Sequence, residues 1–301
     1  MKIIFVLGIL AAMANGSAFR PRNAITLNKN ILKGPLLDLR AGDGGEIPLP
    51  TPLPQSKSFD LRDPGHLFVA AYLIQGSLFS LFPGQQANFY NWWEPENSEE
   101  ALALTEMLGL AVLARGVASY CAQIKDMEAL TSLGYCAAAC IPWAVRGYLT
   151  NSYLKAGVGN AKFAHLVVVN LFYMAVAFAG TSWAPAILKT MMVIYIVMAL
   201  QGIFFPKAFM ASWCNDQLPE WRTLFLVKGF SYFLLGLEIH NLLILAGTEP
   251  AKAMAYSSIP CLYHFLYSLF VSREATEAGR PTGYLFWAVF FSYCITSILV
   301  K

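Results

Sequence analysis

The stretch WCNDQLPEWRTLFLVKGFSYFLLG, residues 213–236, decides how the chain is divided, because a similar stretch occurs earlier in the sequence. Shifting the sequence by 120 residues aligns the two stretches without a gap. The aligned pairs include Trp93 with Trp213, Gly109 with Gly229 and Gly116 with Gly236. Self-similarity at a fixed shift is the signature of an internal repeat. The sequence therefore predicts a chain built from two related halves.

The composition of the chain is that of a membrane protein. Of its 301 residues, 57% are hydrophobic and only 13% are charged, whereas about 25% of the residues of a soluble domain are charged. The net charge of +3 is too small to indicate a nucleic-acid partner. We therefore expect the lipid bilayer to be the main partner of this chain.

Apolar segments recur from residue 66 onward, and most are long enough to cross a bilayer as a helix, which takes about 20 residues. They lie at 66–83, 101–121, 129–149, 162–180, 184–206, 222–246, 252–272 and 283–300. The prediction is an all-α polytopic helical membrane protein with about eight transmembrane helices. Four helices fall in each half, at 63–182 and 183–301. Because an even number of crossings returns the chain to the same side, the two four-helix repeats are expected to be parallel.

The prolines support the same division. Pro83 and Pro206 each close the first segment of a half, and Pro142 and Pro260 each lie inside the third. A proline removes one backbone donor and bends or ends a helix. We expect corresponding bends in the two halves.

The N-terminal region is typical of a targeting sequence. Residues 1–18 combine Lys2, an apolar run and small residues suited to cleavage, and so predict a secretory-type signal peptide. Residues 19–62 begin with a basic, acid-free stretch and continue as a linker rich in Pro and Gly. The junction from Gly16 to Pro21 resembles the bipartite presequences of diatoms and other red-lineage algae. That resemblance implies a plastid (chloroplast) membrane, thylakoid or envelope; the alternative is a membrane of the secretory pathway.

Ionisable side chains inside apolar segments mark candidate functional sites, since a charge in a bilayer is costly. Five such residues form the candidate intramembrane polar site: Glu106, Arg115, Lys228, Glu238 and His240. Arg115 and Glu238 lie at comparable depth in different halves, so we expect them to pair. The alternative is that these charges only fix the packing of the two halves.

Two glycine pairs are expected to mediate helix packing. Gly109 and Gly116, like Gly229 and Gly236, are two helical turns apart and share one face. Small residues of this kind let helices approach closely in lipid. The sequence contains no phosphate-binding loop, nucleophile elbow, HExxH or paired ExxH motif. It specifies no catalytic residue, no metal site and no cofactor, and the prediction leans away from an enzyme.

The pattern of prolines, glycines and basic residues in the two halves resembles the DoxX-like four-helix membrane proteins. The resemblance rests on a proline at the end of the first helix of each half, followed by a helix with Gly-x6-Gly and a basic residue. The matching residues are Pro83, Gly109, Arg115 and Gly116 in one half, and Pro206, Lys228, Gly229 and Gly236 in the other. This chain departs from the family by its duplication. The resemblance implies a four-helix fold for each half and, for some members, a link to quinone or redox processes.

Three functions follow as hypotheses. The first is a non-catalytic membrane component that binds a lipid, quinone or pigment between its halves, or that assembles with other membrane proteins. The second is a small-solute or ion transporter with the charged residues at its midplane, for which Pro142 and Pro260 are the best support. The third is a membrane oxidoreductase in which His165, His240 or His264 ligates a cofactor.

Overall fold

The computed structural model describes residues 58–91, 98–213 and 221–300, and in these ranges the chain is helical and has no strand. The predicted signal peptide, the basic segment behind it and Trp93 lie outside the described residues. The all-α fold class is confirmed for the described part.

Eight long helices coincide with the eight apolar segments to within a few residues. They are α2 (Pro64–Leu81), α4 (Ser98–Gln123), α5 (Ala129–Thr150), α7 (Asn160–Ala179), α8 (Ala184–Phe204), α10 (Trp221–Leu245), α11 (Pro250–Phe270) and α13 (Pro281–Leu299). Four short helices lie between them: α3 (Pro83–Phe89), α6 (Ser152–Lys155), α9 (Pro206–Trp213) and α12 (Glu274–Glu277).

The order of long and short helices is the same from α2 to α7 and from α8 to α13. Pro83 starts α3 after a bend of 107°, and Pro206 starts α9 at the corresponding place. Before α6 and α12 the chain turns through a left-handed residue, Asn151 or Arg273. Pro142 and Pro260 lie inside α5 and α11, the third long helix of each series.

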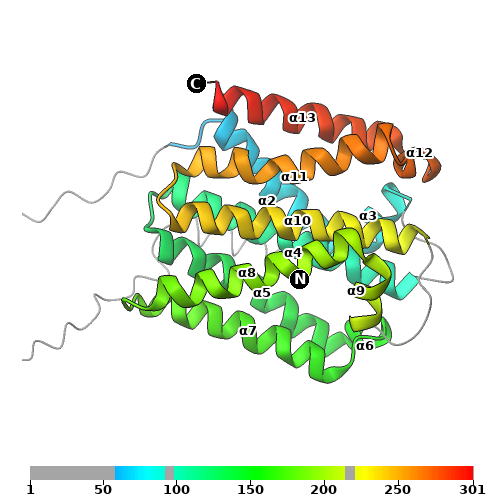
Figure 1. The fold of residues 1–301 in the computed structure, drawn as a ribbon, viewed down its shortest axis with the longest axis horizontal. Helices are drawn as coiled ribbons and strands as arrows, with labels where there is room; N and C mark the ends of the chain where they lie inside the picture. Colours follow the sequence, from blue (N-terminus) through cyan, green and yellow to red (C-terminus); the bar gives the residue numbers. More distant parts are fainter. Residues whose placement is uncertain (1–57, 92–97, 214–220, 301) are drawn as a thin grey trace, which may run out of the picture. The chain divides into compact units, whose positions relative to one another are not determined.

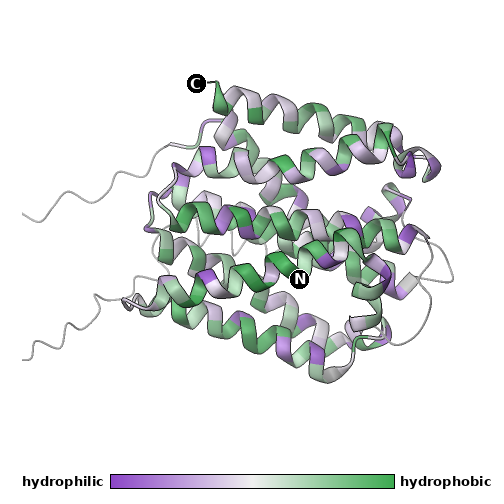
Figure 2. Cartoon of the chain, viewed as in Figure 1, coloured by the Kyte–Doolittle hydropathy of each residue, from purple (hydrophilic) through white to green (hydrophobic). Residues whose placement is uncertain are grey.

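Five helices are long and apolar enough to cross a membrane, or six if the bent pair α2 and α3 counts as one span. The five are α4, α7, α8, α10 and α13, whereas α5 and α11 do not meet this measure. Hydrophobic residues dominate the lengths of α7, α8 and α13 (Figure 2). These three helices are only 22%, 28% and 33% buried, and the central helix α4 is 83% buried. Such wide exposure of apolar surface is compatible with a lipid environment.

The two most buried helices, α4 and α10, pack against each other at the centre of the described bundle. Helices α13, α11, α10, α8 and α7 lie side by side in that order (Figure 1), and α2, α4 and α5 form a second row against them. Each central helix contacts the first and third long helices of its own series and, across the middle, the other central helix. The pair α4 and α10 therefore forms the main contact between the two halves.

The four predicted packing glycines all lie in tight contacts, but with different partners. A Cβ atom added at Gly109 or Gly116 would collide with the backbone of α2. One added at Gly229 or Gly236 would meet α11, and at Gly236 also Arg115 of α4. The two glycines of each pair thus face the same neighbouring helix, as their seven-residue spacing requires. That neighbour is the first long helix of the series for one pair, α2, and the third long helix for the other, α11.

Candidate functional site

Arg115 of α4 is completely buried between the two halves and bonds to α11. Its Nη2 donates to the backbone carbonyl of Met254 (2.9 Å) and to the hydroxyls of Ser257 (2.5 Å) and Ser258 (2.7 Å). Its guanidinium carbon lies 4.7 Å from the centre of the Tyr72 ring on α2, a cation–π distance. Arg115 therefore connects three helices by hydrogen-bond and ring contacts.

His240 of α10 extends this polar network. Its Nε2 lies 2.9 Å from the Ser119 hydroxyl of α4, and the same hydroxyl lies 3.3 Å from the sulfur of Met254. Arg115 and His240, which the sequence places in one candidate site, are thus both connected to Met254 of α11, Arg115 directly and His240 through Ser119. Together they link α4, α10 and α11.

The predicted ion pair between Arg115 and Glu238 is wrong. The ion pairs found among the described residues do not include it, and the partners of Arg115 are hydroxyls and a carbonyl of α11. Glu238 instead lines a cavity next to α5, α7 and α8. The physical reason is the helical period. Two residues at the same depth on different helices contact each other only if both side chains point toward the interface between those helices.

The other two candidate charges pair locally. Glu106 of α4 accepts a hydrogen bond from Arg146 of α5 at 3.1 Å, and Lys228 of α10 bonds to Glu274 of α12 at 2.6 Å. Glu106 and Lys228 lie at similar positions along the two central helices, with opposite charge. Each ion pair ties a central helix to its own half, and we assign both a packing role.

The cavity that Glu238 lines, here the polar chamber, has a volume of about 150 Å³. It is bounded by helices of both halves: α4, α5, α6 and α7 on one side and α8, α9 and α10 on the other. Most of its wall is apolar. Its polar lining residues include Glu238, Asn241, Tyr173, Tyr195 and Asn170.

Three buried polar side chains of this wall each have an atom without a hydrogen-bond partner within the described part of the chain. They are Oε2 of Glu238, Oδ1 of Asn241 and the hydroxyl of Tyr173. The three residues are only 5%, 2% and 6% exposed. A buried polar group without a partner costs about 1–3 kcal/mol. Because Glu238 and Asn241 are three residues apart on α10, they share a face, and α7 brings Tyr173 to the same cavity.

Outside the long helices, Tyr153 of α6 also lines the polar chamber. Burial and the nearby carboxylate of Glu106 raise the pKa of its hydroxyl well above the usual value. The Tyr153 hydroxyl is therefore neutral at physiological pH.

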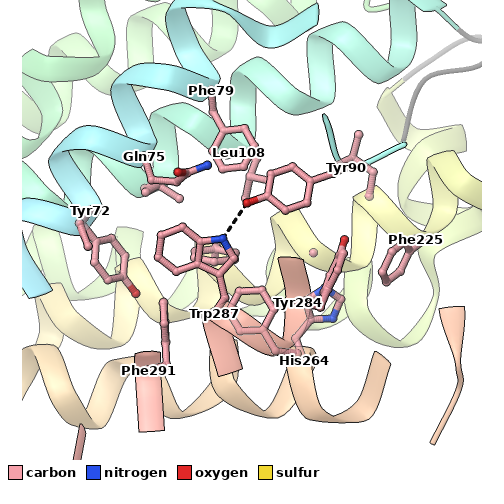
Figure 3. A pocket seen from close by; sticks show the side chains of 16 residues that line it. Tyr72, Gln75, Phe79, Tyr90, Leu108, Phe225, His264, Tyr284, Trp287 and Phe291 are labelled. Carbon is pink, nitrogen blue, oxygen red and sulfur yellow. Dashed lines mark hydrogen bonds between the residues drawn. The ribbon is translucent and has the colours of Figure 1, made fainter. Parts of the chain in front are cut away.

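A second, much smaller cavity, here the aromatic chamber, has a volume of about 40 Å³ and lies among α2, α3, α4, α10, α11 and α13. Figure 3 shows rings from several of these helices pointing toward one another around it. Two of its hydroxyls have partners: Trp287 Nε1 donates to the Tyr90 hydroxyl (2.6 Å), and the Tyr72 hydroxyl lies 3.3 Å from that of Ser258. Unlike the polar chamber, its wall has no buried, unpartnered side-chain polar atom among the described residues.

The two chambers are lined by corresponding positions of the two halves. Residues 121 to 123 apart in the sequence occupy the same places in the two walls. Such pairs are Tyr72 with Tyr195, Tyr90 with Trp213, Leu108 with Phe230, and Leu166 with Trp287. Each chamber is thus enclosed by the first helices of one half, the last helices of the other half and the central pair.

The histidines do not form a paired ligand site in the described ranges. His264 lines the aromatic chamber, His240 bonds to Ser119, and His165 is exposed. His66 stacks on Phe59 near the start of α2. No group of three or more metal-ligating side chains occurs in the part of the chain that the structure describes.

Several residues of the site were not identified from the sequence. Asn241 and Tyr173 lie inside apolar runs, where a single neutral polar residue is common. Ser257 and Ser258 form a polar pair in the middle of an apolar segment, which was a usable signal for a buried donor nearby. Nothing in the local sequence connects that pair to Arg115, which lies more than 130 residues earlier.

No family model, curated protein or solved structure matches this chain.

Proposed function

We propose that this protein is a non-catalytic component of a plastid membrane that binds a hydrophobic small molecule in the polar chamber. The N-terminal presequence pattern is the support for the plastid. The eight apolar helices would cross the membrane as two parallel four-helix units, a duplicated DoxX-like arrangement. The recurring helix order and the corresponding chamber walls support the duplication.

The observation that carries the proposal is the set of three unpartnered polar atoms on one apolar wall. A ligand site of this kind is mostly apolar, with a small number of placed polar groups that fix orientation. Glu238, Asn241 and Tyr173 would bond the polar head of the ligand, and the apolar wall would hold its hydrocarbon part. Lipids, quinones and pigments combine these two parts.

Ligand loss on substitution of the chamber residues is the test of this function. The protein is purified in mild detergent from membranes of its native host. Its bound small molecules are extracted and measured by mass spectrometry and by absorption from the near-UV to the red. We expect one compound in stoichiometric amount, reduced about tenfold by Glu238→Leu or Asn241→Leu, because each change removes a buried hydrogen-bonding group worth about 1–3 kcal/mol.

Glu249→Leu is the matched control, since it removes an exposed carboxylate just before α11 that lines neither chamber. Its extract should equal that of the wild type. Bulk membrane lipid alone in the wild-type extract, or equal amounts of the compound in all variants, would refute binding in the polar chamber.

A further inference from the structure

We propose that the polar chamber selects a ligand whose head is a single ring, or a group of that size, that carries a hydroxyl. A head that has only carbonyl or ether oxygens would bind more weakly. This inference rests on the proposed function, because it names the class of compound that the same chamber takes. That class consists of alcohols, phenols and the reduced, hydroxyl form of a quinone.

The acceptors in the chamber wall are the first step of the argument. Oδ1 of Asn241 and Oε2 of Glu238 have no partner among the described residues, and the amide nitrogen of Asn241 already donates to the Cys136 sulfur (3.9 Å). An amide oxygen only accepts hydrogen bonds, and a carboxyl group keeps an acceptor oxygen whether or not it carries a proton. Two acceptor groups of the wall therefore lack a donor.

The Tyr173 hydroxyl is the second step. It also has no partner in the described part of the chain, and both Tyr173 and Glu238 lie close to Asn241. A ligand hydroxyl at this place can accept from Tyr173 and donate to Asn241 or Glu238, so one oxygen serves both needs. A carbonyl or ether oxygen only accepts and would leave both acceptors buried without a donor, which is costly. An ammonium only donates and would leave the Tyr173 hydrogen without an acceptor.

The volume of the chamber indicates the size of the head. The chamber measures about 150 Å³, the volume of an engineered apolar cavity in another protein that takes up one benzene molecule. Most of the wall is apolar, and the unpartnered polar atoms come from α7 and α10. A single ring with one hydroxyl therefore matches both the space and the wall.

The outer side of the chamber has room for the rest of a longer ligand. Leu166 and Val169 of α7 and Met198 of α8 line the chamber, and all three side chains are partly exposed. These two helices are also the least buried of the five candidate spans that the structure describes. An apolar tail could thus leave the chamber beside α7 and α8 and lie along their outer surface in the lipid.

Three single-ring probes that differ in their head test the proposal. The first, para-fluorophenol, carries a hydroxyl; para-fluoroanisole has an ether oxygen that only accepts, and para-fluorobenzylamine has an ammonium that only donates. Their dissociation constants are measured by fluorine NMR on the full-length protein in mild detergent, as the saturable part of the binding. We expect the phenol to bind about tenfold more tightly than the anisole, because only the phenol can donate to the buried acceptors.

Variants separate the chamber from the micelle, which also takes up these probes. In the double variant Glu238→Leu with Asn241→Leu, the preference for the phenol over the anisole should disappear, and in Glu249→Leu it should stay as in the wild type. Asn241→Leu alone replaces the double variant if that does not fold. Ala144→Phe should fill the chamber and abolish saturable binding of every probe, and Met198→Trp, in the same wall, is the substitute for it.

Equal affinity for the phenol and the anisole in the wild type, with both lost in Ala144→Phe, would overturn the selection of a hydroxyl and leave the chamber as a binding site. Tighter binding of the amine than of the phenol would overturn it as well. A preference for the phenol that persists without both acceptors would show that Glu238 and Asn241 do not provide it. Absence of saturable phenol binding would also refute this inference, whereas the extraction from native membranes decides the proposed function on its own.

Discussion

Replacing Arg115 by lysine is expected to destabilise the protein by about 3–5 kcal/mol, more than replacing it by methionine. Lysine keeps a cationic end, but it has no second terminal nitrogen to replace Nη1, which lies 3.9 Å from the Cys261 sulfur, and no flat guanidinium to stack on the Tyr72 ring. A buried charge with incomplete hydrogen bonding retains its desolvation cost without the compensating contacts. Methionine has a similar length, removes the charge, and leaves two serines that already donate to carbonyls of their own helix.

The measurement is unfolding in mixed micelles of a mild detergent and SDS, followed by far-UV circular dichroism. The order of stability should be wild type, then Arg115→Met, then Arg115→Lys. A lysine variant as stable as the wild type would show that the flat guanidinium, with its contacts to Cys261 and Tyr72, is dispensable. A lysine variant more stable than the methionine variant would show that charge alone is what matters at this position.

The second large effect is expected for Gly236→Ala, which should cost about 2 kcal/mol in the same assay. The added Cβ would lie 2.7 Å from Nη1 of Arg115 and 2.8 Å from the backbone oxygen of Ser257. Both distances are too short, and one of the two atoms belongs to the backbone of α11, which cannot move by itself. Overpacking of this kind costs about 1–3 kcal/mol.

Gly84→Ala is the control for this substitution, because its Cβ would be 3.5 Å from a Leu102 methyl group, an ordinary contact. The control should be neutral or slightly stabilising, since alanine is the better helix former in α3. In the double variant Gly236→Ala with Arg115→Met, the cost of the alanine should fall by at least half, because one of the two collisions is gone. Strict additivity would argue against contact between the two side chains.

The positions of the helices could be predicted from the sequence because apolar run length alone specifies them. The segment expected at 252–272 is α11, Pro250–Phe270, and the one at 184–206 is α8, Ala184–Phe204. The short helices α6 and α12 could not be found in this way. Four residues are too few to show a periodic pattern, and their start depends on left-handed turns at Asn151 and Arg273.

The site was harder to predict because it depends on which way each helix faces. The sequence aligns best at a shift of 120 residues, whereas the chamber walls correspond at 121 to 123. A difference of two residues turns a helix by about 200°. The glycine pairs that align in sequence therefore face α2 in one half and α11 in the other. For the same reason the depth of Arg115 and Glu238 was predictable, and their partners were not.

The buried guanidinium also decides which halves can assemble. Arg115 belongs to the first half, and its hydrogen-bond acceptors belong to α11 of the second. At the shift of 122 that relates the chamber walls, Leu237 takes the place of Arg115 on α10. Two copies of the first half would bring together two arginines without the serine pair, and two copies of the second would leave that pair without an arginine. The two halves are therefore not interchangeable, and their covalent linkage supplies both in equal number.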